Sequence, residues 1–129
     1  MDATRKYLCF SGGLIILLGF FYGAPKPVIE SAFGIAIDNH ALHIVRAIMG
    51  LYWGIGFMVL LGAIKTEYSR FSLQLQAIFF SGIGFGRLIS FAIDGNANTV
   101  SIFATACEML LFIICMAVLY NYHKRPDAQ

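Results

Sequence analysis

The sequence VSIFATACEMLLFIICMAVLY at residues 100–120 decides the class of fold. The only charged residue in this run is Glu108. An α-helix needs roughly 20 consecutive, mostly apolar residues to cross the hydrocarbon core of a bilayer. A helix on the surface of a soluble protein would instead show a polar face along its whole length. The run therefore predicts a membrane-spanning helix.

Three further apolar runs lie upstream, at residues 7–23, 42–64 and 73–93. The chain of 129 residues is 59% hydrophobic and only 12% charged, whereas about 25% of the residues of an average soluble domain are charged. We therefore expect one all-α membrane domain over residues 1–129, folded as a bundle of four transmembrane helices.

The first run follows Arg5 and Lys6 and so resembles the start of a secretory signal peptide. The residues at the end of this run, FYGAP at 21–25, make a poor cleavage site because small residues are not at the required positions. We expect this run to stay in the protein as the first span.

The orientation of the spans is predicted from the basic residues in the short loops, which gather on the cytoplasmic side. One side of the expected bundle carries Arg5, Lys6, Lys65, Arg70, Lys124 and Arg125. The other side carries only Lys26 outside the apolar runs. Both termini are therefore predicted to be cytoplasmic. The connector at 24–39 is too apolar for a solvated loop, and it predicts a short helix in the outer interface or a cap over the bundle mouth.

Three ionisable residues interrupt the apolar runs: Arg46, Arg87 and Glu108. Each costs at least about 2.5 kcal/mol at the bilayer centre, so such residues are expected to pair or to face a wet cavity. With the predicted topology, all three lie in the outer half of the membrane on different helices. We expect them to meet there, with Glu108 pairing with either Arg46 or Arg87.

Helical spacing adds four polar neighbours to this cluster: His43, Ser90, Asp94 and Thr105. Three interpretations of the cluster stay open. It could be a structural ion pair that holds the helices in register. It could bind an anionic lipid or a small ligand, because two guanidinium groups face one carboxylate within the membrane. It could also make the protein a small proton-coupled transporter that uses Glu108.

Glycine spacing predicts close helix packing, because small residues let helix backbones approach each other in lipid. The predicted contact residues are Gly50, Gly54, Gly82 and Gly86, with Gly19 and Gly23 offering a similar face on the first span. Tyrosines near the predicted interfaces, Tyr22 among them, are expected only to anchor the helices at the membrane surface.

Other function classes find little support in the residues. A net charge of +2 without a basic patch argues against nucleic-acid binding. His40 and His43 are too few to predict a metal site, and no arrangement of residues indicates nucleophilic catalysis or a phosphate-binding loop. We therefore expect no cofactor and no metal, and the residues favour a role other than that of an enzyme.

The segment NHALHIVRAIMGLYWG at residues 39–54 resembles a short motif, HxxRxxMGLY, of small four-span bacterial membrane proteins. GRLIS at 86–90, Asp94-Gly95, Glu108 and Tyr22-Gly23 before Pro25 also resemble this group, the domain-of-unknown-function 4345 family. The resemblance implies a bacterial inner-membrane protein but no activity. We expect a binding or accessory module for an anionic lipid, a small ligand, a partner membrane protein or a second copy of the chain.

Overall fold

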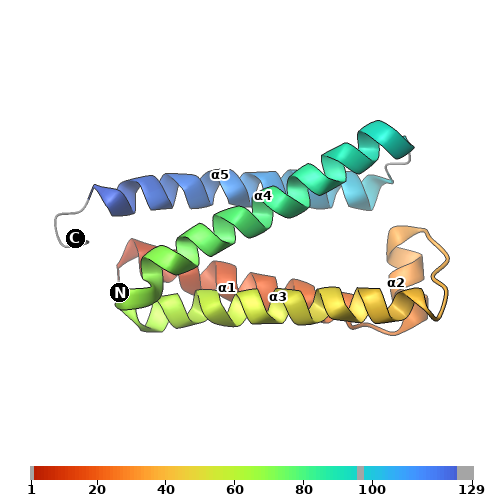
Figure 1. The fold of residues 1–129 in the computed structure, drawn as a ribbon, viewed down its shortest axis with the longest axis horizontal. Helices are drawn as coiled ribbons and strands as arrows, with labels where there is room; N and C mark the ends of the chain where they lie inside the picture. The colour runs from red at the N-terminus through yellow and green to blue at the C-terminus, as the bar shows by residue number, and fades with distance from the viewer. Residues whose placement is uncertain (1, 96–97, 125–129) are drawn as a thin grey trace.

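The structure, a computed structural model, describes residues 2–95 and 98–124. Within these residues the chain is helical and contains no strand (Figure 1). The elements in order are α1 Ala3–Tyr22, α2 Lys26–Phe33, α3 Ala41–Ile64, the 3-10 helix η1 Thr66–Tyr68, α4 Ser69–Asp94 and α5 Thr99–His123. The predicted all-α class is confirmed.

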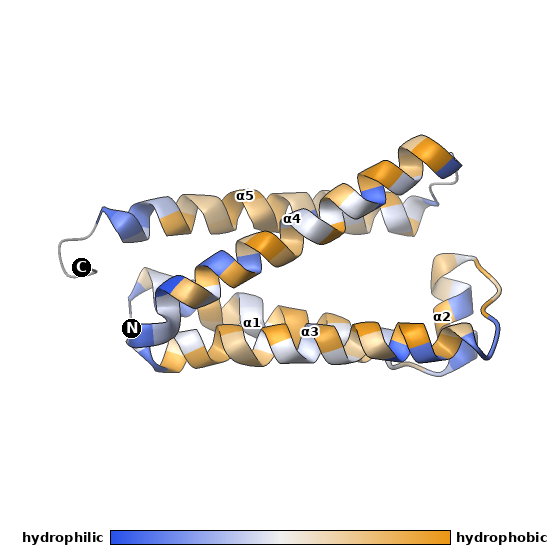
Figure 2. Cartoon of the chain, in the orientation of Figure 1, coloured by the Kyte–Doolittle hydropathy of each residue, from blue (hydrophilic) through white to orange (hydrophobic). Residues whose placement is uncertain are grey.

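The four long helices, α1, α3, α4 and α5, are long and apolar enough to cross a membrane. They match the four predicted runs to within a few residues at each end. Figure 2 shows that hydrophilic residues concentrate at the helix ends and in the connections, as expected where a helix leaves the bilayer. The predicted four-span architecture is therefore confirmed.

The long helices form two layers, with α1 against α3 in one and α4 against α5 in the other (Figure 1). Helix α4 runs obliquely: it lies against α3 near η1 and leaves it toward Asp94. Helices α1 and α5 hardly touch each other directly. The bundle is therefore closed along one side and at the η1 end, and it is more open between α1 and α5 and at the end that carries α2.

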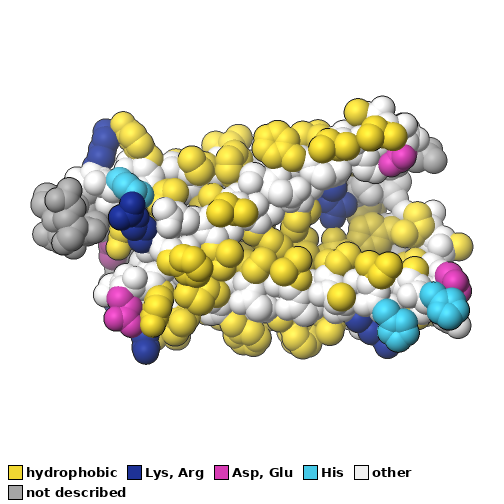
Figure 3. Space-filling view, viewed as in Figure 1, with side chains coloured by type: hydrophobic (Ala, Val, Ile, Leu, Met, Phe, Trp, Pro, Cys, Tyr) yellow, Lys and Arg dark blue, Asp and Glu magenta, His cyan; other side chains and the backbone are white. Residues whose placement is uncertain are grey.

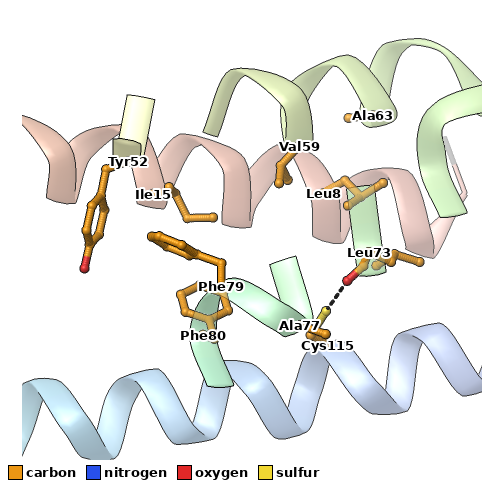
Figure 4. Packing of buried hydrophobic residues seen from close by; sticks show 10 residues of the cluster. All are labelled: Leu8, Ile15, Tyr52, Val59, Ala63, Leu73, Ala77, Phe79, Phe80 and Cys115. Carbon is orange, nitrogen blue, oxygen red and sulfur yellow. Dashed lines mark hydrogen bonds between the residues drawn. The ribbon is translucent and has the colours of Figure 1, made fainter. Parts of the chain in front are cut away.

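The apolar core lies between the layers, where Leu8 and Ile15 of α1 and Val59 of α3 meet Phe79 and Phe80 of α4 (Figure 4). Leu8, Ile15 and Val59 are completely buried. Burial from lipid gains little free energy, so the fit of these side chains holds the helices together.

Helix α2 is the short helix predicted between spans one and two. It ends at Gly34, whose φ of 65° is left-handed and suits a residue without Cβ. The backbone N–H of Ile37 then donates to Oε1 of Glu30 at 2.7 Å, which folds the connector back on the helix. Figure 1 shows α2 across the end of the bundle, between the two layers.

Gly50, Gly54, Gly82 and Gly86, which were predicted to pack helices together within one chain or between chains, do not do so within the chain. A Cβ atom built on any of these four glycines would meet nothing within 4 Å outside its own helix. Glycines that do lie against a neighbouring helix are Gly12, Gly19, Gly23, Gly56, Gly62 and Gly84. The spacing that suggested contact recurs on several faces of these helices, so it could not tell which face meets a neighbour. Only the expectation for Gly19 and Gly23 is confirmed.

Candidate functional site

The centre of the site is an ion pair between α4 and α5. Nε of Arg87 lies 3.0 Å from Oε2 of Glu108, and both side chains are largely buried, with exposed fractions of 20% and 9%. Nε and Oε2 are themselves fully buried, and within the described residues the ion-pair contact is their one polar interaction. The pair cancels two charges within the membrane.

Tyr22, at the end of α1, is the second partner of Arg87. Nη2 of Arg87 donates to the hydroxyl oxygen of Tyr22 at 3.0 Å. The Tyr22 ring stacks on Phe33 of α2 and lies 5.1 Å, centroid to centroid, from the ring of Tyr52 on α3. Arg87 therefore links three of the four long helices through side chains.

A hollow of about 400 Å³ lies beside this group, between α1 and α5. We call it the α1–α5 hollow. Its lining residues are Leu14, Leu18, Phe21, Tyr22, Phe33, Tyr52, Arg87, Val100, Phe103, Ala104, Cys107, Glu108 and Leu111. Apart from Tyr22, Tyr52, Arg87 and Glu108, these side chains are apolar or weakly polar. The volume falls within the range of roughly 300–1,000 Å³ typical of small-molecule sites.

A second hollow of about 350 Å³ lies on the other side of the same residues, between α3 and α4. We call it the α3–α4 hollow. It shares Tyr22, Tyr52 and Arg87 with the first hollow. Gly82 and Gly86 also line it, so two of the glycines predicted to bring helices together instead leave space. Figure 3 shows basic atoms inside the molecule between the two layers, in the half that carries α2.

The sequence predicted that Arg46 would join Arg87 and Glu108, and the structure places it elsewhere. Arg46 is exposed, and within the described part of the chain it makes no hydrogen bond or ion pair. It shares the exposed face of α3 with His43 and Gly50, whereas Tyr52 is buried. Arg46 lies near the start of α3, where a long side chain can extend to the interface instead of pairing.

The other predicted neighbours of the cluster are also dispersed. Ser90 donates to Oδ2 of Asp94 at 2.7 Å, and both side chains are exposed, although Ser90 also lines the α3–α4 hollow. Thr105 is buried and donates to the carbonyl oxygen of Ser101 one turn earlier. His43 is exposed. Of the predicted set, the contacts among the described residues join Arg87 with Glu108 across two helices and Ser90 with Asp94 on one helix.

Comparison with known proteins places the chain in a family. Residues 3–119 match the profile described as a domain of unknown function, DUF4345. The chain belongs to this family. The match covers most of the DUF4345 chain and confirms the resemblance seen in its short motifs. No curated protein and no solved structure matches the sequence.

Two residues of the DUF4345 site were not assigned a site role from the sequence. Tyr22 was expected only to anchor α1, and Tyr52 was given no role. Tyr52 is 3% exposed and lines both hollows. Both tyrosines lie in the segments that carry the family resemblance, and that was the one signal in the sequence that could have found them.

The described residues hold no group of three or more His, Cys, Asp or Glu side chains that could bind a metal ion. The polar groups that line the hollows are one guanidinium, one carboxylate, two phenols and the hydroxyl of Ser90. This set can donate and accept hydrogen bonds in a largely apolar setting. Its chemistry is suited to holding a polar group of a ligand rather than to ligating a metal.

Proposed function

We propose that this DUF4345 protein is an intramembrane binding module whose ligand places a polar group against Arg87, Glu108 and Tyr22. The main support for this proposal is that the buried Arg87–Glu108 pair forms part of the wall of the α1–α5 hollow. A buried ion pair that only joined two helices would be expected in well-packed surroundings, because its free atoms need partners. Here the pair borders open space instead.

The test is native mass spectrometry of the protein extracted gently from its own membranes. The wild type should retain a bound molecule that can be measured and fragmented. The double variant Arg87→Gln/Glu108→Gln should lose it, since it removes the charges but keeps polar side chains of similar size. Arg46→Gln is the matched control, because it removes an arginine that lies outside the hollow.

Circular dichroism and gel filtration should show that the double variant is folded. A bound molecule that survives in this folded variant would contradict the proposed role of the pair. The absence of any retained molecule from the wild type, across two mild detergents and a detergent-free polymer extraction, would contradict the binding function itself.

The alternative, a small proton-coupled transporter that uses Glu108, needs access to the carboxylate from both faces of the membrane. Lys65 and Arg70, at the opposite end of the bundle, line neither hollow. Packed core residues such as Ile15, Val59 and Phe80 occupy the bundle interior. No specific observation favours transport, so it ranks second.

We also propose that the protein lies in the bacterial inner membrane with both termini in the cytoplasm. In the described structure, Arg5, Lys65 and Arg70 lie at the η1 end of the bundle, and Lys26 lies at the α2 end. Basic residues favour the cytoplasmic side. A C-terminal green fluorescent protein should fluoresce in cells, whereas a C-terminal alkaline phosphatase should be inactive. The reverse pattern would invert the proposed topology.

A further inference from the structure

The α1–α5 hollow is covered at the end of the bundle. Phe33 of α2 lines it there, and the side-chain amide of Asn98 donates a hydrogen bond to the carbonyl oxygen of Phe33. The side-chain amide oxygen of Asn98, Oδ1, also caps α5 by accepting from the N–H of Ser101. These bonds tie α2 to the start of α5. A ligand therefore meets the least obstruction at the side of the bundle, where α1 and α5 hardly touch.

The edge of this side opening is apolar and exposed. Leu18 and Phe21 of α1 are 37% exposed, and Phe103 of α5 is 70% exposed. Because the long helices cross the membrane, such side chains face lipid tails rather than water. The opening therefore connects the hollow with the hydrocarbon of the bilayer, and the ligand would come from there.

The charges within the site argue against an ionised ligand. Glu108 already neutralises Arg87, and Arg46 lies outside the hollow. Glu108 is about 14 Å along α5 from Thr99, and Arg87 is about 10 Å along α4 from Asp94, at roughly 1.5 Å per residue. An added phosphate or carboxylate would be an unpaired charge at hydrocarbon depth, which is costly. An uncharged hydroxyl, ester or amide adds no charge at this depth, so it costs much less to bury beside the ion pair.

The volume limits the apolar part of the ligand. At roughly 30 Å³ for each water-sized group, a hollow of this size holds about 13 such groups. One acyl chain of ordinary length is enough to account for this volume. The lining of aliphatic and aromatic side chains suits such a chain.

Resting on the proposed binding function, we infer that the ligand is a single-chain lipid with an uncharged, hydrogen-bonding head group, which enters from the bilayer between α1 and α5. The head lies against Arg87 and Glu108, and the chain occupies the hollow and its side opening.

The test compares three probes with the same 14-carbon chain, titrated into the purified protein in a short-chain detergent. Monomyristoylglycerol is uncharged with one chain, myristoyl lysophosphatidic acid carries a phosphate, and dimyristoylglycerol is uncharged with two chains. Binding is measured by native mass spectrometry. The inference expects monomyristoylglycerol to bind at least tenfold more tightly than either other probe.

A matched pair of variants shows whether binding occurs in the hollow. Ala104 lines the hollow, so Ala104→Phe should fill part of it and weaken binding at least tenfold. Ala106, two residues along α5, is exposed, so Ala106→Phe should leave binding unchanged. Neither variant replaces a residue of the ion pair.

The outcomes separate this inference from the proposed function. If the phosphate probe binds as tightly as monomyristoylglycerol and Ala104→Phe weakens both, the uncharged head is wrong but the binding function stands. If dimyristoylglycerol binds equally, the single chain is wrong. If no probe shows binding that depends on Ala104, the hollow is not a lipid site, and the proposed function then depends on the molecule retained from native membranes. If that molecule is also absent, both proposals fail.

Discussion

The two ends of the bundle are built differently. At the η1 end, side chains of one helix bond to the backbone of the next: Ser69 to Gly62 at 2.7 Å, Ser72 to Met58 at 2.9 Å, and Arg5 to Ala63 at 2.7 Å. At the α2 end, α1 and α3 still touch, but the two layers stand apart around two hollows, and the main link between them is the group of Arg87, Glu108 and Tyr22.

This difference shows how a small membrane protein can combine a rigid part with a candidate binding site. Hydrogen bonds to backbone carbonyls require helices to touch, and they fix the η1 end. Long side chains such as arginine can link helices that do not touch, so they leave space between them. The comparison predicts that mutations have different effects at the two ends.

The largest effect is expected at the ion pair. Arg87→Leu leaves Glu108 without its partner in a low-dielectric site and should lower the free energy of unfolding by about 3–5 kcal/mol. The double variant Arg87→Leu/Glu108→Leu should recover most of this loss. Unfolding in mixed micelles, titrated with sodium dodecyl sulfate, measures both. Strict additivity of the two single changes would show that the residues are not coupled.

A smaller effect is expected from glycines that differ in their surroundings. A Cβ on Gly62 would collide with Ser72 at the η1 end, whereas a Cβ on Gly86 would meet nothing within 4 Å. Gly62→Ala should therefore lower the free energy of unfolding by about 1–3 kcal/mol. Gly86→Ala should leave it unchanged or raise it slightly, by up to about 1 kcal/mol, through helix propensity. Equal effects in the same unfolding assay would contradict the contrast between the two ends.

The smallest effect is expected for the hydroxyl of Tyr22. Tyr22→Phe removes the acceptor for Nη2 of Arg87 but keeps the ring, so it should cost about 1–2 kcal/mol. Tyr68→Phe is the matched control, because Tyr68 is exposed at the η1 end. If Tyr68→Phe lost as much stability as Tyr22→Phe, the Tyr22 hydroxyl would have no specific role in the site.

The sequence predicted the spans because hydrophobic length is set by the bilayer and not by tertiary contacts. It also identified Arg87 and Glu108, because a charge inside the membrane is costly enough to require a partner. It could not choose between Arg46 and Arg87. That choice depends on which face of α3 meets its neighbours, and α3 is apolar nearly all round.

The same ambiguity explains the glycines. Gly50 and Gly54 are as well spaced for packing as any pair in the chain, yet they lie on the exposed face of α3. Gly56 and Gly62, which do meet neighbouring helices, carry no stronger local signal. Nor could the hollows be predicted, because they result from the oblique path of α4 and the separation of α1 from α5.

Cross-linking can test directly whether the α1–α5 hollow takes up a ligand from the bilayer. Monomyristoylglycerol with a photoreactive diazirine in its chain is activated on the protein in phosphatidylcholine vesicles, and labelled positions are mapped by tandem mass spectrometry. Excess label is expected at Leu14 and Leu111, which line the hollow, and it should disappear in Ala104→Phe but persist in Ala106→Phe. Label spread evenly over exposed positions such as Phe57 and Ile113, and equal in both variants, would contradict the claim.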